Sequence, residues 1–137
     1  MNRIIHKETY TNGQAIFKEG SYGETLYVIL SGKVEVSKMI NGEKVSIAFL
    51  SKGEIFGEIS FIDKKPRTAS VMAVGSVEVG LIDQDFIDHE VNRISSEFGV
   101  ILNALTERLR KTTANFVNLK AEYDQLKTEY EKLKRAN

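Results

Sequence analysis

The sequence predicts a mainly β fold, an antiparallel sandwich or barrel, followed by one long α-helix. Between residues 14 and 82, short apolar stretches alternate with turns that contain glycine, which is typical of antiparallel strands. From Phe98 to the last residue no proline occurs, and apolar residues recur in alternating steps of three and four. That spacing indicates a helix with one apolar side.

The composition fits one domain and excludes several kinds of chemistry. A chain of 137 residues can bury a core of its own. It contains no cysteine, which excludes disulfides, thiolate metal sites and cysteine nucleophiles. Its formal net charge is zero, so we expect no general attraction to nucleic acid or to an anionic membrane. No apolar run is long enough to span a bilayer, and we expect a cytoplasmic chain.

The turns divide the β region into short strands. In the first 13 residues, Ile4 and Ile5 would pack a short helix or strand against the chain that follows. We expect Ser31-Gly32 and Gly75-Ser76 to turn the chain between strands, and Asn41-Gly42 is the strongest hairpin signal. The expected strands cover residues 15–17, 26–30, 33–37, 44–50, 69–74 and 77–82.

Helical signals interrupt and follow these strands. Glu58 to Ile62 could form a single helical turn, whose first N–H groups would point at a bound anion. Asp83-Gln84-Asp85-Phe86 indicates a second helix start, with acidic residues in its first turn.

The long helix carries the pattern of a coiled coil. Over about five heptads, apolar residues and one threonine occupy the a and d positions. At 1.5 Å per residue the helix would extend on the order of 50 Å, too far for the β region alone to cover. We therefore expect a parallel homodimer through the helix from Leu102 to Leu133, with a lone solvated helix as the alternative. The positions are Leu102, Leu105, Leu109, Thr112, Phe116, Leu119, Tyr123, Leu126, Tyr130 and Leu133.

The stretch from Phe56 to Val71, FGEISFIDKKPRTASV, holds groups that suit a phosphorylated ligand. Gly57 lets the backbone approach a ligand closely, and Arg67 offers a rigid fork of donors matched to phosphate. Glu58 would accept hydrogen bonds from hydroxyl groups. Together they favour a compact ligand with one phosphate and a neighbouring sugar hydroxyl. The plainer alternative is a Glu58–Arg67 salt bridge in a turn, which would contribute at most about 1 kcal/mol if exposed.

This stretch resembles the phosphate-binding cassette of cyclic nucleotide-binding domains, a family found in the catabolite activator protein, cyclic-nucleotide-regulated kinases and ion channels. A second signature of the family is matched before it, and the resemblance covers roughly residues 5 to 120. Phe17, Ser21 and Phe61 differ from the residue types usual in the family, and we expect none of them to touch the matched ligand-binding positions. The second signature is matched by Gly20-Ser21-Tyr22-Gly23, Leu26-Tyr27-Val28-Ile29 and Gly32.

The resemblance implies a particular architecture. The family's fold is an antiparallel β-roll of two sheets with a jelly-roll path, a double-stranded β-helix. Residues 1–97 would form this cyclic nucleotide-binding β-roll with short flanking helices. Residues 98–137 would form the long dimerising coiled-coil helix.

The resemblance also implies roles for the cassette residues. Glu58 would accept a hydrogen bond from the ribose 2′-hydroxyl, and Arg67 would pair with the cyclic phosphate. Thr68 would cap the phosphate or the base through its hydroxyl. Val36 and Ile47 would form an apolar wall beside the base. Further contacts to the sugar and phosphate would come from Phe56, Gly57, Ile59 and Ser60.

The helix segment from Arg108 to Thr113 resembles the dimer helix of the catabolite activator family. There, a threonine and the following small hydroxyl residue contact the adenine, and the second reaches across from the other subunit. The matching positions are Thr112 and Thr113, and Arg108 matches an arginine near the ribose and the cassette glutamate. For Thr112, which falls on a d position, a polar residue that sets the register is the alternative.

These observations lead us to expect a non-enzymatic cyclic nucleotide sensor without a metal or other cofactor. Thr112 and Thr113 favour cyclic AMP, whereas Thr68 leaves a cyclic-GMP-selective sensor open. The heptads continue to the last residues with no basic recognition helix, so we expect no direct nucleic-acid contact. The output would lie in a larger regulator or in an effector on another chain.

Two alternatives come from other classes of protein. One is a structural dimerisation module whose cassette binds nothing. The other is a cupin-like β-barrel enzyme, which would need a metal-binding cluster of His and Glu, whereas His6 and His89 lie far apart in the sequence.

Overall fold

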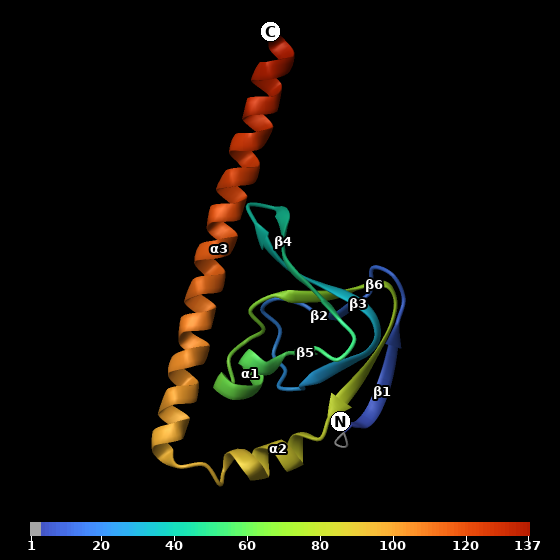
Figure 1. Cartoon of the computed structure of the whole chain (residues 1–137), viewed down its shortest axis with the longest axis vertical. Coiled ribbons are helices and arrows are strands. Elements are labelled where there is room, and N and C mark those ends of the chain that lie inside the picture. The colour runs from blue at the N-terminus through green and yellow to red at the C-terminus, as the bar shows by residue number, and fades with distance from the viewer. Residues whose placement is uncertain (1–3) are drawn as a thin grey trace.

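The computed structural model describes residues 4–137, and it confirms an antiparallel β fold followed by a long C-terminal helix (Figure 1). Residues 1–3 of the predicted 1–97 domain lie outside the described residues. In chain order the elements are β1 (Ile4–Tyr10), β2 (Ala15–Phe17), β3 (Tyr27–Ile40), β4 (Glu43–Ser51), β5 (Ile55–Phe56), α1 (Glu58–Asp63), β6 (Ser70–Ile82), α2 (Gln84–Val91) and α3 (Ser96–Ala136).

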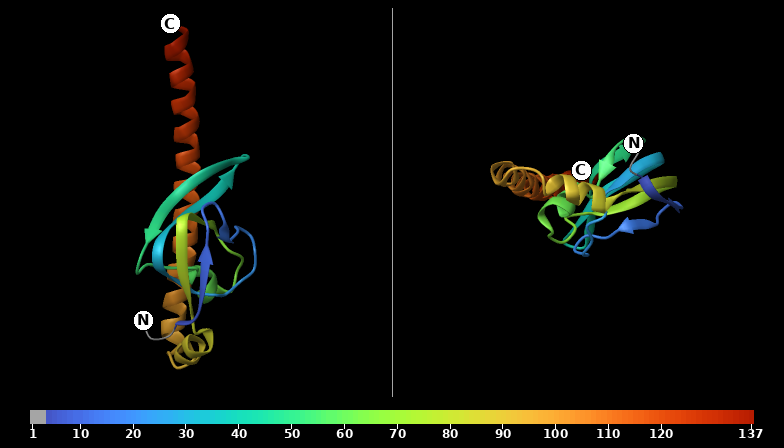
Figure 2. Two further views of the ribbon diagram at one scale, coloured as in Figure 1. Left: turned by 90° about the vertical axis from the view of Figure 1, so that its right-hand side faces the viewer. Right: turned by 90° about the horizontal axis from the view of Figure 1, so that it is seen from below.

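The strands form one curled sheet built on the two longest strands. Its order is β1-β6-β3-β4, while β2 pairs with β6 and β5 pairs with β3. The predicted β-roll is confirmed, and the sheet curls on itself (Figure 2). The two sheets expected in the roll are joined into one, because β3 and β6 take hydrogen-bonded partners in both halves of the roll.

Gly32 and Gly75 bend strands that we expected them to end. β3 continues through Ser31-Gly32, and β6 continues through Gly75-Ser76. Ser31 pairs with Glu78 and Lys33 pairs with Val74, so residues 75–77 of β6 lie opposite Gly32 alone. Both glycines have positive φ, 86° and 74°. The predicted turns are therefore a bulge that bends both strands while their pairing resumes on either side.

The hairpin predicted at Asn41-Gly42 and the helical turn predicted at Glu58 are both confirmed. Ile40 pairs with Glu43, so Asn41-Gly42 is the two-residue connection of a hairpin. The helical turn predicted at Glu58 is α1, six residues long.

The hydrophobic core lies inside the curl of the sheet. Strand alternation brings Val34 and Val36 to the same face, where Val34 is fully buried and Val36 packs against the core. The buried cluster consists of Tyr27, Ile29, Val34, Phe56, Val71, Ala73, Val77 and Val79.

The two C-terminal helices begin at side-chain caps. The Asp83 carboxylate accepts a hydrogen bond from the Phe86 N–H at the start of α2. The Ser95 hydroxyl accepts one from the Phe98 N–H, so α3 begins at Ser96, two residues before the predicted boundary. No helix within residues 4–137 is long and apolar enough to cross a membrane.

One stripe of α3 packs on the roll, and its C-terminal part extends beyond it (Figures 1 and 2). Thr106 and Val117 are buried on the packed stripe, and the Lys120 ammonium donates to the Ser46 carbonyl of β4. Arg110 lies on the same stripe and contacts Asp63 at the end of α1 and Pro66 in the loop that follows. These contacts fix the rotation of the helix about its axis relative to the roll.

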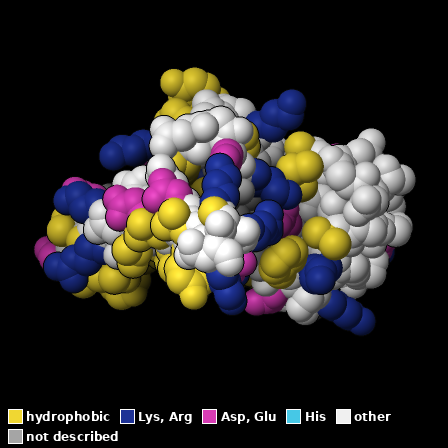
Figure 3. Space-filling view, turned by 90° about the horizontal axis from the view of Figure 1, so that it is seen from above, with side chains coloured by type: hydrophobic (Ala, Val, Ile, Leu, Met, Phe, Trp, Pro, Cys, Tyr) yellow, Lys and Arg dark blue, Asp and Glu magenta, His cyan; other side chains and the backbone are white. Residues whose placement is uncertain are grey.

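The heptad residues of α3 form a second stripe, which is exposed. Leu119, Leu126 and Leu133 are each about two-thirds exposed, whereas Leu102 is half-buried. Figure 3, which looks onto the C-terminal end of α3, shows hydrophobic side chains at the surface between charged ones. The other large exposed members of the stripe are Leu105, Leu109, Phe116, Tyr123 and Tyr130.

The bulge predicts a large difference between two glycine substitutions. A Cβ at Gly32 would lie 2.3 Å from the Ser76 carbonyl oxygen, whereas a Cβ at Gly75 would meet nothing within 4 Å. Because both positions have positive φ, Gly75→Ala is the matched control. We expect Gly32→Ala to lower the free energy of unfolding by roughly 2–4 kcal/mol and Gly75→Ala by about 1 kcal/mol in urea titrations. Equal losses would show that the close approach to Ser76 does not determine the bend.

Candidate functional site

A cavity of about 320 Å³ lies between the cassette, the β3–β4 region and α3. Its volume is at the lower end of the range of about 300–1,000 Å³ typical of small-molecule sites. Of the residues predicted for the site, those that line it are Val36, Ile47, Phe56, Gly57, Glu58, Ile59, Ser60, Arg67, Thr68 and Thr113. Most of the predicted set is thus brought together by the fold.

Gly57 precedes α1, and a side chain at this position would be obstructed by its neighbours. Its φ is 88°, and a Cβ there would lie 2.8 Å from the Thr25 carbonyl oxygen and 3.0 Å from Arg67 Nη1. Directly after it, α1 is anchored by the buried Ser60 and Phe61. Glu58, in the first turn, remains exposed at the cavity. The glycine therefore allows the backbone, the cassette helix and the arginine to meet at one point.

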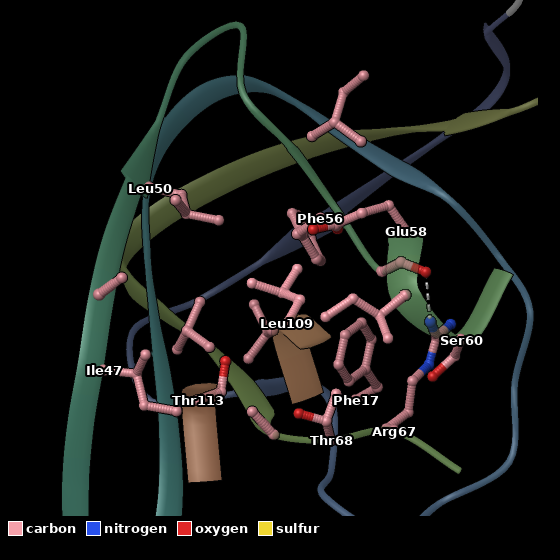
Figure 4. A pocket seen from close by; sticks show the side chains of 17 residues that line it. Phe17, Ile47, Leu50, Phe56, Glu58, Ser60, Arg67, Thr68, Leu109 and Thr113 are labelled. Atoms are coloured by element: carbon pink, nitrogen blue, oxygen red, sulfur yellow. Dashed lines mark hydrogen bonds between the residues drawn. The ribbon is translucent and has the colours of Figure 1, made fainter. Parts of the chain in front are cut away.

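Arg67 is buried, and three groups hold its guanidinium. Figure 4 shows Phe17 beside it and one of its two hydrogen bonds. Nη1 donates to the Gly57 carbonyl at 3.0 Å, and Nη2 donates to the Thr25 carbonyl at 2.9 Å. The guanidinium lies over the Phe17 ring, with Cζ 4.1 Å from the ring centroid. Burial lowers the pKa of Arg67 from its usual value, while Tyr27 and Glu58 oppose that shift. An arginine remains charged under these conditions, so the site holds a fixed buried cation.

Glu58 and Arg67 do not form the salt bridge that was the plainer alternative. Within residues 4–137 no ion pair joins them, although Glu58 acts on the charge of Arg67 through space. The carboxylate and the guanidinium are therefore separate features of one cavity.

The two signature stretches of the sequence are hydrogen-bonded to each other. The Arg67 N–H donates to the Ser21 carbonyl at 2.8 Å, and the Gly20 N–H donates to the Arg67 carbonyl at 2.8 Å. The Glu19 N–H also donates to the Ser70 hydroxyl at 2.9 Å. The turn at Gly20 and Ser21 thus holds the backbone of Arg67 in place through two hydrogen bonds.

Two of the residues that differ from the family's usual types touch Arg67, which corrects our expectation that none would. Phe17 contacts its side chain and Ser21 its backbone. The sequence separation of 50 residues between Phe17 and Arg67 left no local signal for this contact. Phe17 lies in β2, which pairs with the start of β6 and so comes beside the cassette.

Helix α3 presents Leu109 and Thr113 to the cavity of its own chain, whereas Arg108 and Thr112 are exposed and do not line it. The resemblance implied the reverse order for the two threonines. Adjacent helical residues lie about 100° apart, and the packed stripe includes Thr113 rather than Thr112. A contact of Arg108 or Thr112 with a ligand in a second chain stays a prediction.

An unpredicted ion pair joins α3 to the cassette. The Arg110 guanidinium donates to both oxygens of the Asp63 carboxylate, once at 2.8 Å, and to the Pro66 carbonyl at 3.3 Å. The hydrogen bonds from Arg110 hold the pKa of the Asp63 carboxyl below its usual value, although burial opposes them. One helix residue therefore holds both ends of the loop between α1 and Arg67. Residues 4–137 contain no cluster of three or more potential metal ligands.

The Asp63–Arg110 pair predicts a pH-dependent contribution to stability. Because the folded pKa of Asp63 lies below the unfolded value of about 3.9, the contribution is present above that pH and is lost as pH falls through the folded pKa. In urea titrations at pH 7, Asp63→Asn should lower the free energy of unfolding by about 1–3 kcal/mol. The difference from wild type should shrink below about pH 4.

The control for this prediction is an exposed ion pair on the same helix. Lys111 Nζ lies 3.2 Å from Glu107 Oε1, and both side chains are mostly exposed. Glu107→Gln should change the free energy of unfolding by less than about 1 kcal/mol. A pH-independent loss in Asp63→Asn would contradict a contribution from the ionised carboxylate.

Comparisons with known proteins show which family the chain is similar to. The profile of the family "Cyclic nucleotide-binding domain" matches residues 7–93. A CRP-like cAMP-activated global transcriptional regulator of Mycobacterium tuberculosis is 30% identical over 120 residues, 87% of this chain and 54% of that protein. The chain thus spans about half the length of this relative.

Solved structures share the fold of most of the chain. The cAMP-bound form of the EAL enzyme Bd1971 gives a TM-score of 0.74 at 28% identity, covering 94% of this chain and 33% of that one. Its cGMP-bound form gives 0.70 at 26% identity, covering 93% and 34%. The catabolite activator protein of Thermus thermophilus gives 0.62 at 30% identity, covering 84% and 55%. With the profile matched over more than half of its length, the chain belongs to the cyclic nucleotide-binding domain family.

Proposed function

We propose that this chain is a non-enzymatic sensor that binds a cyclic nucleotide, with cyclic AMP as the favoured ligand. The observation that carries the proposal is the buried, pre-oriented Arg67 at a cavity with Glu58 at its side. A buried cation in a small cavity suits a ligand with a single negative charge, such as a cyclic phosphate.

The cassette supports a pose for the sugar and the phosphate. The phosphate would accept hydrogen bonds from Arg67 and from the first N–H groups of α1, because the first intrahelical bond there is donated by Phe61. Glu58 would accept a hydrogen bond from the ribose 2′-hydroxyl. Gly57, with no side chain, leaves room for this approach.

The part of the cavity away from Arg67 and Glu58 supports binding of a base. Val36, Ile47 and Leu109 supply apolar walls, and Thr68 and Thr113 supply hydroxyl groups. Cyclic AMP is favoured because the M. tuberculosis relative is described as cAMP-activated. Thr113, for which the family resemblance implies a contact with adenine, also lines the cavity. Cyclic GMP is the alternative, since threonine hydroxyls both donate and accept, and Bd1971 has been solved with either nucleotide.

Helix α3 supports coupling between ligand and output. It lines the cavity through Leu109 and Thr113 and is tied to the cassette through Arg110. A ligand that binds more tightly to one arrangement of α3 than to another would shift their populations by that difference in affinity.

The exposed stripe of α3 supports a homodimer. Leucine and aromatic residues recur along it in steps of three and four, and so long an apolar stripe is unfavourable in water. A second copy of the chain, packed in parallel through residues 102–133, would cover it. The dimer would then pass the state of the cavity to a downstream effector or to further segments of a larger regulator.

The binding proposal is tested by calorimetric titration of the chain with cyclic AMP and cyclic GMP. We expect micromolar or tighter binding of cyclic AMP and weaker binding of cyclic GMP. Arg67→Ala should lower the affinity by about a hundredfold or more, because a buried charge-assisted contact is lost. Arg93→Ala is the control, since Arg93 is exposed on a distant loop. Millimolar or absent binding of both nucleotides would favour a structural dimerisation module instead.

The dimer proposal is tested by light scattering after size-exclusion chromatography. Leu126→Asp places a charge on the exposed stripe, and Gln125→Asp places the same charge on an exposed neighbouring face. We expect wild type and Gln125→Asp to have the mass of a dimer, and Leu126→Asp that of a monomer, because the carboxylate would be buried between the helices. A monomeric wild type at all concentrations would contradict the dimer.

A further inference from the structure

We infer that Phe17 is a positioning residue for phosphate recognition, because its ring sets the plane in which Arg67 presents its donors. This inference rests on the proposed function only for its effect on binding. The geometry that carries it is present without a ligand.

Three contacts define the orientation of the guanidinium. The carbonyls of Gly57 and Thr25 each hold one edge nitrogen, at 3.0 and 2.9 Å. The guanidinium also lies over the Phe17 ring, with Cζ 4.1 Å from the ring centroid. Two edge contacts alone would leave the group free to tilt about the line that joins them. The Phe17 ring beneath the guanidinium restricts that tilt.

Phe17 is itself held by two neighbouring rings. Its ring centroid lies 6.0 Å from that of Tyr27 and 5.9 Å from that of Phe56, with the planes inclined by 42° and 47°. Tyr27 and Phe56 stack at 5.0 Å and are both buried. The three rings come from β2, β3 and β5, so the aromatic cluster ties the orientation of Arg67 to the core.

The arrangement leaves donors for a ligand. A guanidinium has five N–H donors, and the two carbonyls accept from two of its nitrogens. Phe17 offers no acceptor and cannot compete with a phosphate for the rest. A guanidinium whose plane is already fixed loses less freedom on binding than one that must be ordered. An aliphatic side chain would keep the apolar packing but would lose the flat, electron-rich face.

The experiment compares Phe17→Leu with Phe17→Tyr, which keeps the ring. In the titration, Phe17→Leu should weaken cyclic AMP binding by about three- to thirtyfold. Adenosine, which lacks the phosphate, should bind both proteins equally well. Phe17→Tyr should restore the preference for cyclic AMP over adenosine. An equal loss for both ligands would assign Phe17 a merely structural role and overturn the inference.

A second readout needs no ligand and separates this inference from the proposed function. In ¹H–¹⁵N spectra of the free chain, the Nε–H signal of Arg67, identified by its absence in Arg67→Lys, should be shifted by the ring current and exchange slowly. It should keep both properties in Phe17→Tyr and lose them in Phe17→Leu. An unchanged signal in Phe17→Leu would overturn the positioning role, even if wild type bound cyclic AMP.

A failure of the nucleotide titration and a failure of the NMR measurement would have different meanings. If wild type bound no nucleotide, the proposed function would fall while the Nε–H signal still decided the role of Phe17. If Phe17→Leu did not fold, Phe17→Met, which keeps a similar volume without the ring, would be judged by the same two readouts.

Discussion

Burying the guanidinium of Arg67 costs hydration free energy, which the surrounding structure must offset from several directions. The carbonyls of Gly57 and Thr25, the ring of Phe17 and the field of Glu58 together supply that compensation. These groups come from three separate parts of the chain, and the pairing of β2 and β3 with β6 and of β5 with β3 brings them together. The cation therefore links the core of the roll to the lining of the cavity.

Helix α3 joins this site to the outer surface because it carries two stripes of different chemistry. One stripe, with Thr106, Thr113 and Val117, packs on the roll and lines the cavity. The other, with Leu119 and Leu126, is apolar and exposed. Since both belong to one rigid helix, a rotation that alters the first stripe must also move the second. The ion pair of Arg110 with Asp63 also attaches the cassette to the helix, so a movement of the helix would move the cassette as well.

Features set by neighbouring residues could be predicted from the sequence, and features set by distant contacts could not. The Asn41-Gly42 hairpin, α1 and the grouping of the cassette residues depend on local turn chemistry. The sequence does not distinguish a bulge from a turn at Gly32, because glycine is favoured in both and only the pairing with the opposite strand separates them. The contacts of Phe17 with Arg67 and of Asp63 with Arg110 each join residues about 50 positions apart. The packed stripe of α3 was missed because Thr106, Arg110 and Thr113 are polar, so only the heptad stripe showed a hydrophobic period.

We propose that a pre-oriented Arg67 receives the phosphate of a cyclic nucleotide whose base reaches α3 of the same chain. The most direct measurement is a ¹H–¹⁵N NMR titration of the labelled chain with cyclic AMP. We expect the largest shifts at the amides of residues 57–60 and 67–69, at the Arg67 side chain and at Thr113. Shifts that leave these groups unchanged, or no shifts at saturating nucleotide, would contradict it.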